Sequence, residues 1–164
     1  MTAVQLFLPL APYFEVRDGN PLALTIAKNH YSQLWRGRID SPRFMPPGKR
    51  LILIHPVGLW LFAWSFQKHR LDNQQGVCCT LFRNESDIKS SEIILMAEVA
   101  WNTKYGPGRK FTYVHPKKIR STNPGYCFQC AGWEKVQNHK STRGLILLTK
   151  ENTPVNYSTG ATAS

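Results

Sequence analysis

The residues best suited to chemistry in this 164-residue chain lie between residues 109 and 133. The segment Lys110 to His115 alternates apolar or aromatic with polar side chains, which predicts a β-strand. Asn123-Pro124 has the composition of a helix start, because asparagine caps free backbone N–H groups and proline suits the first helical position. Three cations lie between these two elements: Lys117, Lys118 and Arg120. A helix N-terminus beside cations predicts an anion site, and the alternative is an ordinary strand-to-helix connection with a solvated basic loop.

Acyl transfer is one reaction that such a stretch could support. It requires a base for the attacking amine, a donor for the oxyanion and a proton for the leaving group. His115 ends the predicted strand and could act as the base, because an unperturbed imidazole has a pKa of about 6.5. Ser121, Asn123 and the helix amides could hold a phosphate or an oxyanion. A lone histidine is more often structural, which is the alternative for His115.

The charge of the chain is strongly positive. It has 21 lysine and arginine residues against 10 aspartate and glutamate residues, a net charge of +11. This balance favours a polyanionic partner, with nucleic acid first and an anionic membrane surface second. The absence of a basic amphipathic helix disfavours the membrane, and no apolar run is long enough to span one. General solubility is the alternative explanation of the charge.

Four cysteines lie in apolar segments: Cys78, Cys79, Cys127 and Cys130. No signal peptide is evident, so we expect reduced thiols and a cytoplasmic protein. A zinc site is the alternative to buried thiols. It is disfavoured because adjacent cysteines on a strand point to opposite faces of a sheet.

The remaining elements follow from periodicity and from turn residues. The predicted order is a strand at Gln5–Leu10, a helix from Pro21 to about Tyr31 capped by Asn20, strands at Leu51–His55, Leu59–Phe66 and Gly76–Arg83, a helix from Ser90 or Ser91 to Tyr105, the strand and short helix described above, and strands at Trp133–Val136 and Gly144–Thr149. This order predicts a mixed α/β (α+β) fold around one sheet. Residues 1–150 would form one domain, and residues 151–164 a flexible tail.

Residues 35–50 are predicted to form a long loop. Arginines alternate there with Trp35 and Phe44, a composition suited to backbone contacts and to stacking on bases. A disordered cationic loop is the alternative.

The order of elements and the sequence NPGYCFQCAGW, residues 123–133, are similar to the GNAT acyltransferase fold over residues 21–150. The resemblance implies a central mixed sheet with helices on both faces. Its fourth and fifth strands, here Gly76–Arg83 and Lys110–His115, would splay apart around an acyl-coenzyme A. Tyr126, in the first turn of the short helix, would be the general acid, and a core aromatic is the alternative.

Residues 83–92, RNESDIKSSE, stand where the GNAT family has a glycine-rich pyrophosphate loop, and they contain no glycine. The pattern His30-Tyr31-Ser32, with Arg83-Asn84 and Ser86, is similar to the phage Mom-like branch, whose members modify bases in phage DNA and also lack the standard loop. The resemblance makes His30 a second candidate base, and Glu85 is a third, with a solvated loop acid as its alternative. The candidate cofactor-binding residues are Arg83, Asn84, Ser86, Ser90, Ser91 and Asn123.

We therefore predict a GNAT-like transferase that modifies a nucleic-acid base, most readily DNA of a phage or mobile element. The donor implied is acyl-coenzyme A, and the location is the cytoplasm of a bacterium or a phage-infected cell. A base in a duplex would have to be extruded to react. The candidate phosphate contacts are Arg36, Arg38, Arg43, Lys117, Lys118 and Arg120.

One alternative function is a non-catalytic nucleic-acid-binding protein of the same fold, favoured by the missing glycine loop. The other is an N-acetyltransferase of a small molecule or a protein.

Overall fold

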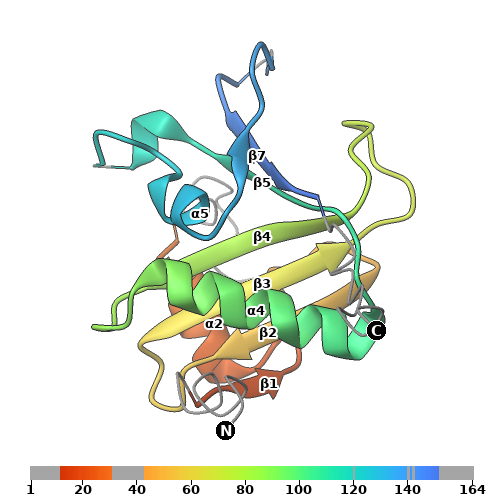
Figure 1. Cartoon of the computed structure of the whole chain (residues 1–164). Coiled ribbons are helices and arrows are strands. Elements are labelled where there is room, and N and C mark those ends of the chain that lie inside the picture. Colours follow the sequence, from red (N-terminus) through yellow and green to blue (C-terminus); the bar gives the residue numbers. More distant parts are fainter. Residues whose placement is uncertain (1–11, 31–42, 120, 140, 142, 152–164) are drawn as a thin grey trace, which may run out of the picture.

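The computed structural model describes residues 12–30, 43–119, 121–139, 141 and 143–151. It contains a seven-stranded sheet in the order β1-β2-β3-β4-β5-β7-β6 (Figure 1). The strands are β1 (Phe14–Val16), β2 (Lys49–Ile54), β3 (Trp60–Phe66), β4 (Val77–Asn84), β5 (Lys110–Val114), β6 (Glu134–Lys135) and β7 (Ile146–Lys150). Neighbouring strands are antiparallel except β4 and β5, which are parallel. The predicted mixed α/β fold around one sheet is confirmed, and it is consistent with a GNAT-like arrangement.

Helices cover both faces of the sheet, as predicted (Figure 1). The helices are α2 (Pro21–Lys28), α4 (Ser90–Tyr105), α5 (Tyr126–Cys130) and the short 3₁₀ helix η1 (Pro116–Lys118). Side chains alternate between the two faces of a strand, so Ile52 and Ile54 pack with α2 while Leu51 and Leu53 join the core beneath α4 and α5. Each face therefore has its own apolar core.

The predicted helix boundaries are partly confirmed. Asn20 caps α2, because its Oδ1 accepts a hydrogen bond from the backbone N–H of Ala23 at 3.1 Å. The helix ends at Lys28, three residues before the predicted end at Tyr31. The prediction that Ser90 or Ser91 caps α4 is wrong. Lys89 occupies the cap position, and the Ser90 hydroxyl instead accepts a hydrogen bond from the side chain of Asn84.

The predicted strands agree closely with the structure. The hairpin of β2 and β3, the third core strand β4 and the closing pair of β6 and β7 are all present. Strand β2 begins at Lys49, two residues inside the segment predicted as a loop. Gln5–Leu10, residues 35–42 of that loop and residues 152–164 of the predicted tail lie outside the described residues.

A β-bulge interrupts β4 at Thr80. Ala63 of β3 pairs with Leu81, and the next residue, Trp64, pairs with Cys79, so Thr80 has no partner on β3. A bulge adds one residue to one strand, bends that strand and increases its twist. The bulge lies one residue beyond the last pair that joins β4 to β5.

Candidate functional site

Strands β4 and β5 are joined at one end only. They pair from Val77 opposite Lys110 to Cys79 opposite Thr112, and no further pairs follow. The last pair is reinforced by the Thr112 hydroxyl, which donates to the carbonyl oxygen of Cys79 at 3.0 Å. Beyond it the two strands separate (Figure 1). The splayed fourth and fifth strands expected from the sequence are therefore present, and the bulge at Thr80 bends β4 at the point of separation.

A cleft of about 320 Å³ occupies the space between the separated strands. It lies at the carboxyl ends of two parallel strands, where α/β proteins commonly bind ligands. Its volume falls at the lower end of the range for small-molecule sites. The lining residues are His30, Cys79, Thr80, Leu81, Phe82, Thr112, Tyr113, Val114, Ile119, Ser121, Asn123, Gly125, Tyr126, Cys127 and Phe128.

Helix α5 forms one wall of this cleft, and close packing fixes its position. Gly125 precedes it with a φ of 84°, and a Cβ there would lie 2.9 Å from the Leu148 side chain, so only glycine fits without strain. The Phe128 ring packs edge-on against Trp133, with 4.9 Å between ring centroids. The helix ends in a Schellman motif at Gly132, with the Trp133 N–H donating to the carbonyl of Phe128 at 3.0 Å.

Lys150 of β7 ties α5 to α4. Its Nζ donates to the carbonyl oxygen of Ala131, at the C-terminus of α5, at 2.8 Å. The same Nζ lies 3.0 Å from Oε1 of Glu98 on α4. Burial raises the pKa of Glu98, and the hydrogen bond from Lys150 opposes that shift. This ion pair between a half-buried lysine and a buried glutamate therefore connects the wall of the cleft to α4.

Tyr126 is the first residue of α5 and lines the cleft, with 60% of its surface exposed. It is therefore not a core aromatic. Its contact with Cys130, one turn along the helix, raises the pKa of the phenol. The hydroxyl is thus protonated at neutral pH, as a general acid requires.

His30 also lines the cleft and is only 8% exposed. Burial lowers the pKa of its imidazole to about 4, and the positive charge of Arg83 adds to this effect. The ring is therefore neutral at neutral pH. A neutral imidazole can accept a proton, although a pKa this low makes it a weak base.

The other two candidate bases lie elsewhere. His115 precedes η1, and Glu85 follows β4 on the exposed surface. Neither is among the described residues that line the cleft. Glu85 instead forms an ion pair with Arg83, whose Nε donates to Oε1 of Glu85 at 3.0 Å.

Four predicted cofactor residues contact one another or their neighbours around the turn after β4. The Oδ1 of Asn84 accepts hydrogen bonds from the N–H and the hydroxyl of Ser86, at 2.9 and 2.6 Å. The Nδ2 of Asn84 donates to the Ile88 carbonyl at 2.7 Å and to the Ser90 hydroxyl at 3.1 Å. Arg83 donates to the carbonyl of Asn29 at 3.0 Å. These groups stabilise the turn itself and do not line the cleft.

The anion site predicted at Asn123 requires a correction. Helix α5 begins at Tyr126, not after Asn123, and Gly125 occupies the cap position. A helix of five residues has too few peptide dipoles for the predicted site. The side chain of Asn123 lines the cleft and donates to Oε1 of Gln129 at 3.3 Å. Ser91 is half-buried in the first turn of α4 and is not among the described lining residues.

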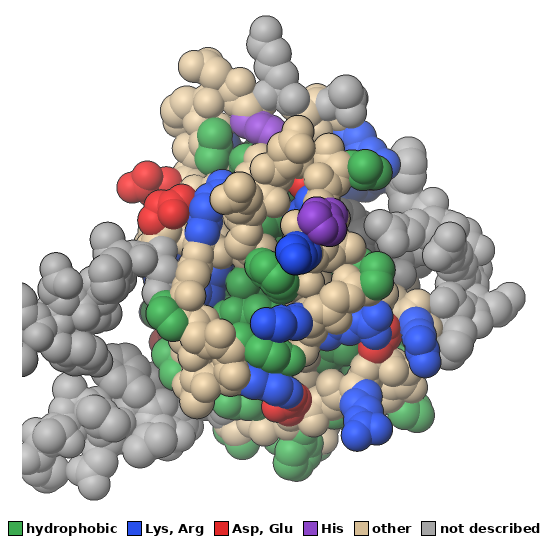
Figure 2. Space-filling view, turned by 90° about the vertical axis from the view of Figure 1, so that its right-hand side faces the viewer, with side chains coloured by type: hydrophobic (Ala, Val, Ile, Leu, Met, Phe, Trp, Pro, Cys, Tyr) green, Lys and Arg blue, Asp and Glu red, His purple; other side chains and the backbone are tan. Residues whose placement is uncertain are grey.

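The predicted nucleic-acid contacts are only partly described. Lys117 and Lys118 are exposed on η1, directly after β5, and Arg43 is exposed before β2. Arg36, Arg38 and Arg120 lie outside the described residues. Figure 2 shows lysine and arginine side chains at several separate places on the described part of one face, with aspartate and glutamate at fewer places.

The cysteines differ from one another in exposure. Cys78 and Cys79 are buried as predicted, and burial raises the pKa of the Cys78 thiol to about 11. Cys127 is half-buried, and Cys130, the last residue of the short helix α5, is exposed, which contradicts the prediction for that residue. Among the described residues, no group of three or more histidine, cysteine, aspartate or glutamate side chains could hold a metal ion.

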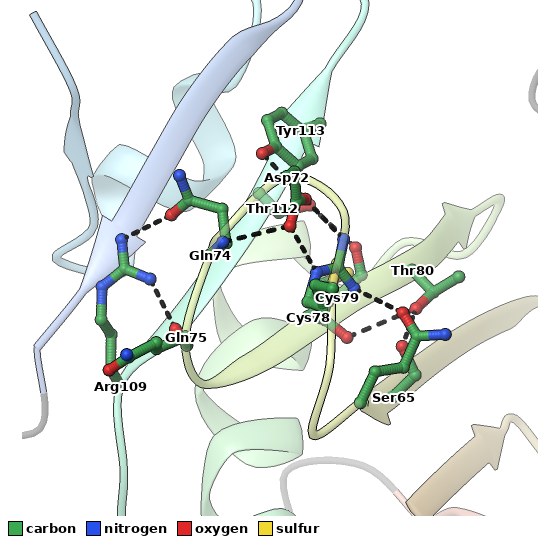
Figure 3. Close-up of polar contacts among 12 residues, drawn as sticks. Ser65, Asp72, Gln74, Gln75, Cys78, Cys79, Thr80, Arg109, Thr112 and Tyr113 are labelled. Atoms are coloured by element: carbon green, nitrogen blue, oxygen red, sulfur yellow. Dashed lines mark hydrogen bonds and ion pairs between the residues drawn. The ribbon is translucent and has the colours of Figure 1, made fainter. Parts of the chain in front are cut away.

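Tyr113 and the polar cluster around it were not predicted from the sequence. Tyr113 lines the cleft, and its hydroxyl donates to Oδ2 of Asp72 at 3.1 Å (Figure 3). Asp72 in turn pairs with Arg70. Burial raises the pKa of Tyr113 to about 12, while the hydrogen bond from Arg70 lowers that of Asp72 to about 2. The alternation of Lys110 to His115 could have indicated Tyr113, but nothing in the sequence pairs it with a loop about 40 residues away.

Comparison with known proteins gives no match: no family model, no curated protein and no solved structure is significantly similar to this chain. None of the helices in the described ranges combines the length and apolar character needed to cross a membrane.

Proposed function

We propose that this protein transfers an acyl-type group onto a base of nucleic acid within the cleft between β4 and β5. The observation that supports this most directly is the separation of these two strands after three residue pairs. Two strands paired along their whole length would leave no room for a donor and an acceptor. The cleft of about 320 Å³ provides such room beside the hydroxyl of Tyr126.

The chemistry follows from the groups that line the cleft. A new bond forms between an exocyclic base nitrogen and the carbonyl carbon of the donor, and the bond from that carbon to the leaving group breaks. Tyr126 is protonated at neutral pH and donates its proton to the leaving group. The attacking nitrogen loses a proton, which the neutral imidazole of His30 or a water molecule accepts. The hydroxyl of Thr80 could donate to the oxyanion, because its oxygen can accept a hydrogen bond from the Ser65 hydroxyl at 2.6 Å.

The positive charge of the chain supports a nucleic-acid acceptor. The net charge is +11, and Lys117 and Lys118 are exposed immediately after the strand that forms one side of the cleft. Such cations bind phosphates without reading sequence. A duplex base would have to be extruded to reach Tyr126.

Coenzyme A does not fit the turn after β4 as the structure stands. The side chains of Asn84, Ser86 and Ser90 are bonded to one another, and the turn has no glycine to let a pyrophosphate approach the backbone. The proposal therefore assigns an acyl-type donor to the cleft but assigns no pyrophosphate site to this turn.

The test is mass spectrometry of nucleosides digested from cells that express the protein. We expect a new nucleoside mass with the wild type, and its loss with Tyr126→Phe, which removes only the proton donor. Tyr13→Phe is the matched control, because Tyr13 is an exposed tyrosine that does not line the cleft. A nucleoside profile identical with and without the wild-type protein would refute the proposal.

The bonded turn after β4 favours a second candidate, a nucleic-acid-binding protein of the same fold without catalysis. It predicts tight, salt-sensitive binding to nucleic acid that leaves every nucleoside unmodified. The same expression experiment separates the two candidates when it is combined with a binding titration over a range of salt concentrations.

A further inference from the structure

The connection between β3 and β4, residues 67–76, presents a leucine to solvent on a firmly held loop. Leu71 is 106% exposed, the largest exposure of any large apolar side chain in the described part of the chain. The loop extends beyond the end of the sheet (Figure 1). A single exposed leucine needs no explanation by itself. The contacts that hold the residues on either side of Leu71 do need an explanation.

Arg70, directly before Leu71, is fixed by three hydrogen bonds. Its Nε and Nη2 donate to the two carboxylate oxygens of Asp72 at 2.9 and 2.7 Å, and its Nη1 donates to Oε1 of Gln67 at 2.9 Å. The guanidinium also lies over the ring of Phe111, with 4.8 Å from Cζ to the ring centroid. The bidentate pair closes a tight turn whose apex is Leu71.

The far side of the loop is held equally well (Figure 3). Asp72 accepts a hydrogen bond from the Gln74 N–H at 3.1 Å and one from the hydroxyl of Tyr113 at 3.1 Å. Arg109 donates to the carbonyl of Gln75 at 2.6 Å and to Oε1 of Gln74 at 3.0 Å. The loop is thus fastened to β5 on both sides of Leu71.

The charge around the tip suits a polyanion. Lys68 and His69 are exposed beside Leu71, and the carboxylate of Asp72 is paired with Arg70. An apolar tip beside an exposed lysine is a composition that architectural proteins use to unstack bases while they contact phosphates. Fixing the tip in advance reduces the entropy lost on binding.

The loop is also connected to the cleft. Tyr113 bonds to Asp72 and lines the cleft, so one side chain joins the base of the tip to the candidate site. A duplex base must leave the stack before it can enter the cleft. A loop that unstacks the duplex next to the cleft would assist that step.

We propose that loop 67–76 is a preformed wedge that inserts Leu71 between stacked bases of duplex nucleic acid, while Lys68 contacts a phosphate. The inference rests on the proposed function for the class of its partner. Loop 67–76 would be the element of the protein that opens the duplex.

The test uses the full chain and a short DNA duplex that carries 2-aminopurine, whose fluorescence rises when the base unstacks. We expect the wild type to raise the fluorescence, and Leu71→Ala to lose most of the rise and bind about tenfold more weakly. Val57→Ala is the matched control, because Val57 is a 70% exposed residue in the turn between β2 and β3. Lys68→Ala should reduce the salt slope of binding by about one counterion and keep the fluorescence rise.

Leu71 is fully exposed, so its truncation should leave thermal unfolding unchanged, and a loss of binding could not be assigned to misfolding. Equal affinity and equal fluorescence for Leu71→Ala and Val57→Ala would overturn the inference, as would a wild type that binds no duplex. A wild type that unstacks the duplex through Leu71 but yields no modified nucleoside would overturn the proposed function alone. Modified nucleosides at wild-type yield with Leu71→Ala, together with undiminished unstacking, would overturn the wedge alone.

Discussion

The two ends of the β4–β5 pair differ in what holds them. At the closed end, residues 77–79 pair with β5, and loop 67–76 is bonded to β5 on both sides of Leu71. The contacts of the loop lie mostly at the surface, whereas the paired residues 77–79 and 110–112 are buried. At the open end β4 and β5 are not paired, and the wall formed by α5 is held chiefly by the partly buried Lys150 with the buried Glu98. Surface contacts are enough to fix a loop, whereas the wall of the open cleft depends on a few contacts that are at least partly buried.

Replacing Lys150 should have the largest effect on stability. Lys150→Met leaves the carboxylate of Glu98 buried without its partner and leaves the carbonyl of Ala131 without its donor. We expect the free energy of unfolding to fall by roughly 3–5 kcal/mol, measured by urea denaturation. Lys135→Met is the control, because Lys135 is exposed on the neighbouring strand β6, and it should change little. Equal losses for the two variants would show that the buried pair does not hold the wall.

His30 should make the open end sensitive to pH. Its pKa is about 4 in the folded protein and near 6.5 when exposed, so between these values only the unfolded chain binds the proton. The contribution of His30 is complete above pH 6.5 and is lost as the pH falls to about 4, a change of roughly 3 kcal/mol. Urea denaturation at several pH values measures it, and His30→Gln should remove this part of the slope. An unchanged slope in that variant would contradict the prediction.

Thr112 marks the boundary between the two ends. Thr112→Val keeps the shape of the side chain and removes its hydrogen bond to the carbonyl of Cys79. We expect a loss of about 1 kcal/mol, with faster amide hydrogen exchange at the last β4–β5 pair. The exposed Thr122→Val is the control. Faster exchange throughout β3 as well would mean that Thr112 supports the whole sheet and not this boundary.

Asp72 should have the smallest effect on global stability, because its contacts in loop 67–76 are exposed. Asp72→Asn weakens the pair with Arg70, and after solvent screening we expect a loss of a few tenths of a kcal/mol. Amide exchange in loop 67–76 should nonetheless become faster.

The ion pair of Asp72 also predicts a pH dependence. The pKa of Asp72 is about 2 against the ordinary 3.8, so its contribution to the free energy of unfolding is complete above about pH 4 and is lost as the pH falls through 2. An NMR titration midpoint near 4 for this carboxyl would contradict the pairing.

The sequence was sufficient for six of the seven strands, all but β1 (Phe14–Val16), and the resemblance to the GNAT fold implied the separation of β4 and β5, but neither predicted the details of the site. Alternating and apolar runs identified β2 to β5, because side-chain periodicity records which face of a strand is buried. The caps at Ser90 and Asn123 were predicted wrongly, since several polar residues in a row can each cap a helix. Tyr126 and His30, each named as a candidate through the resemblance, both line the cleft, whereas His115 and Glu85 do not, because the direction in which a chain leaves a strand is set by tertiary packing. The pairing of Asp72 with Tyr113 joins residues far apart in the chain and left no local pattern.

The unpaired residue at position 80 also determines which way the second half of β4 faces. Val77 and Cys79 belong to the core beneath α4, yet Leu81 belongs to the core beneath α2, and Phe82 returns to the first core. If Thr80 were paired as an ordinary strand residue, simple alternation would send Leu81 and Phe82 to the opposite sides. Deleting Thr80 should therefore leave both side chains in their present cores, because Cys79 and Leu81 would become consecutive residues of a regular strand. The deletion would remove only the local bend of β4 beside the cleft, whereas inserting one further residue there would turn every later residue of the strand over.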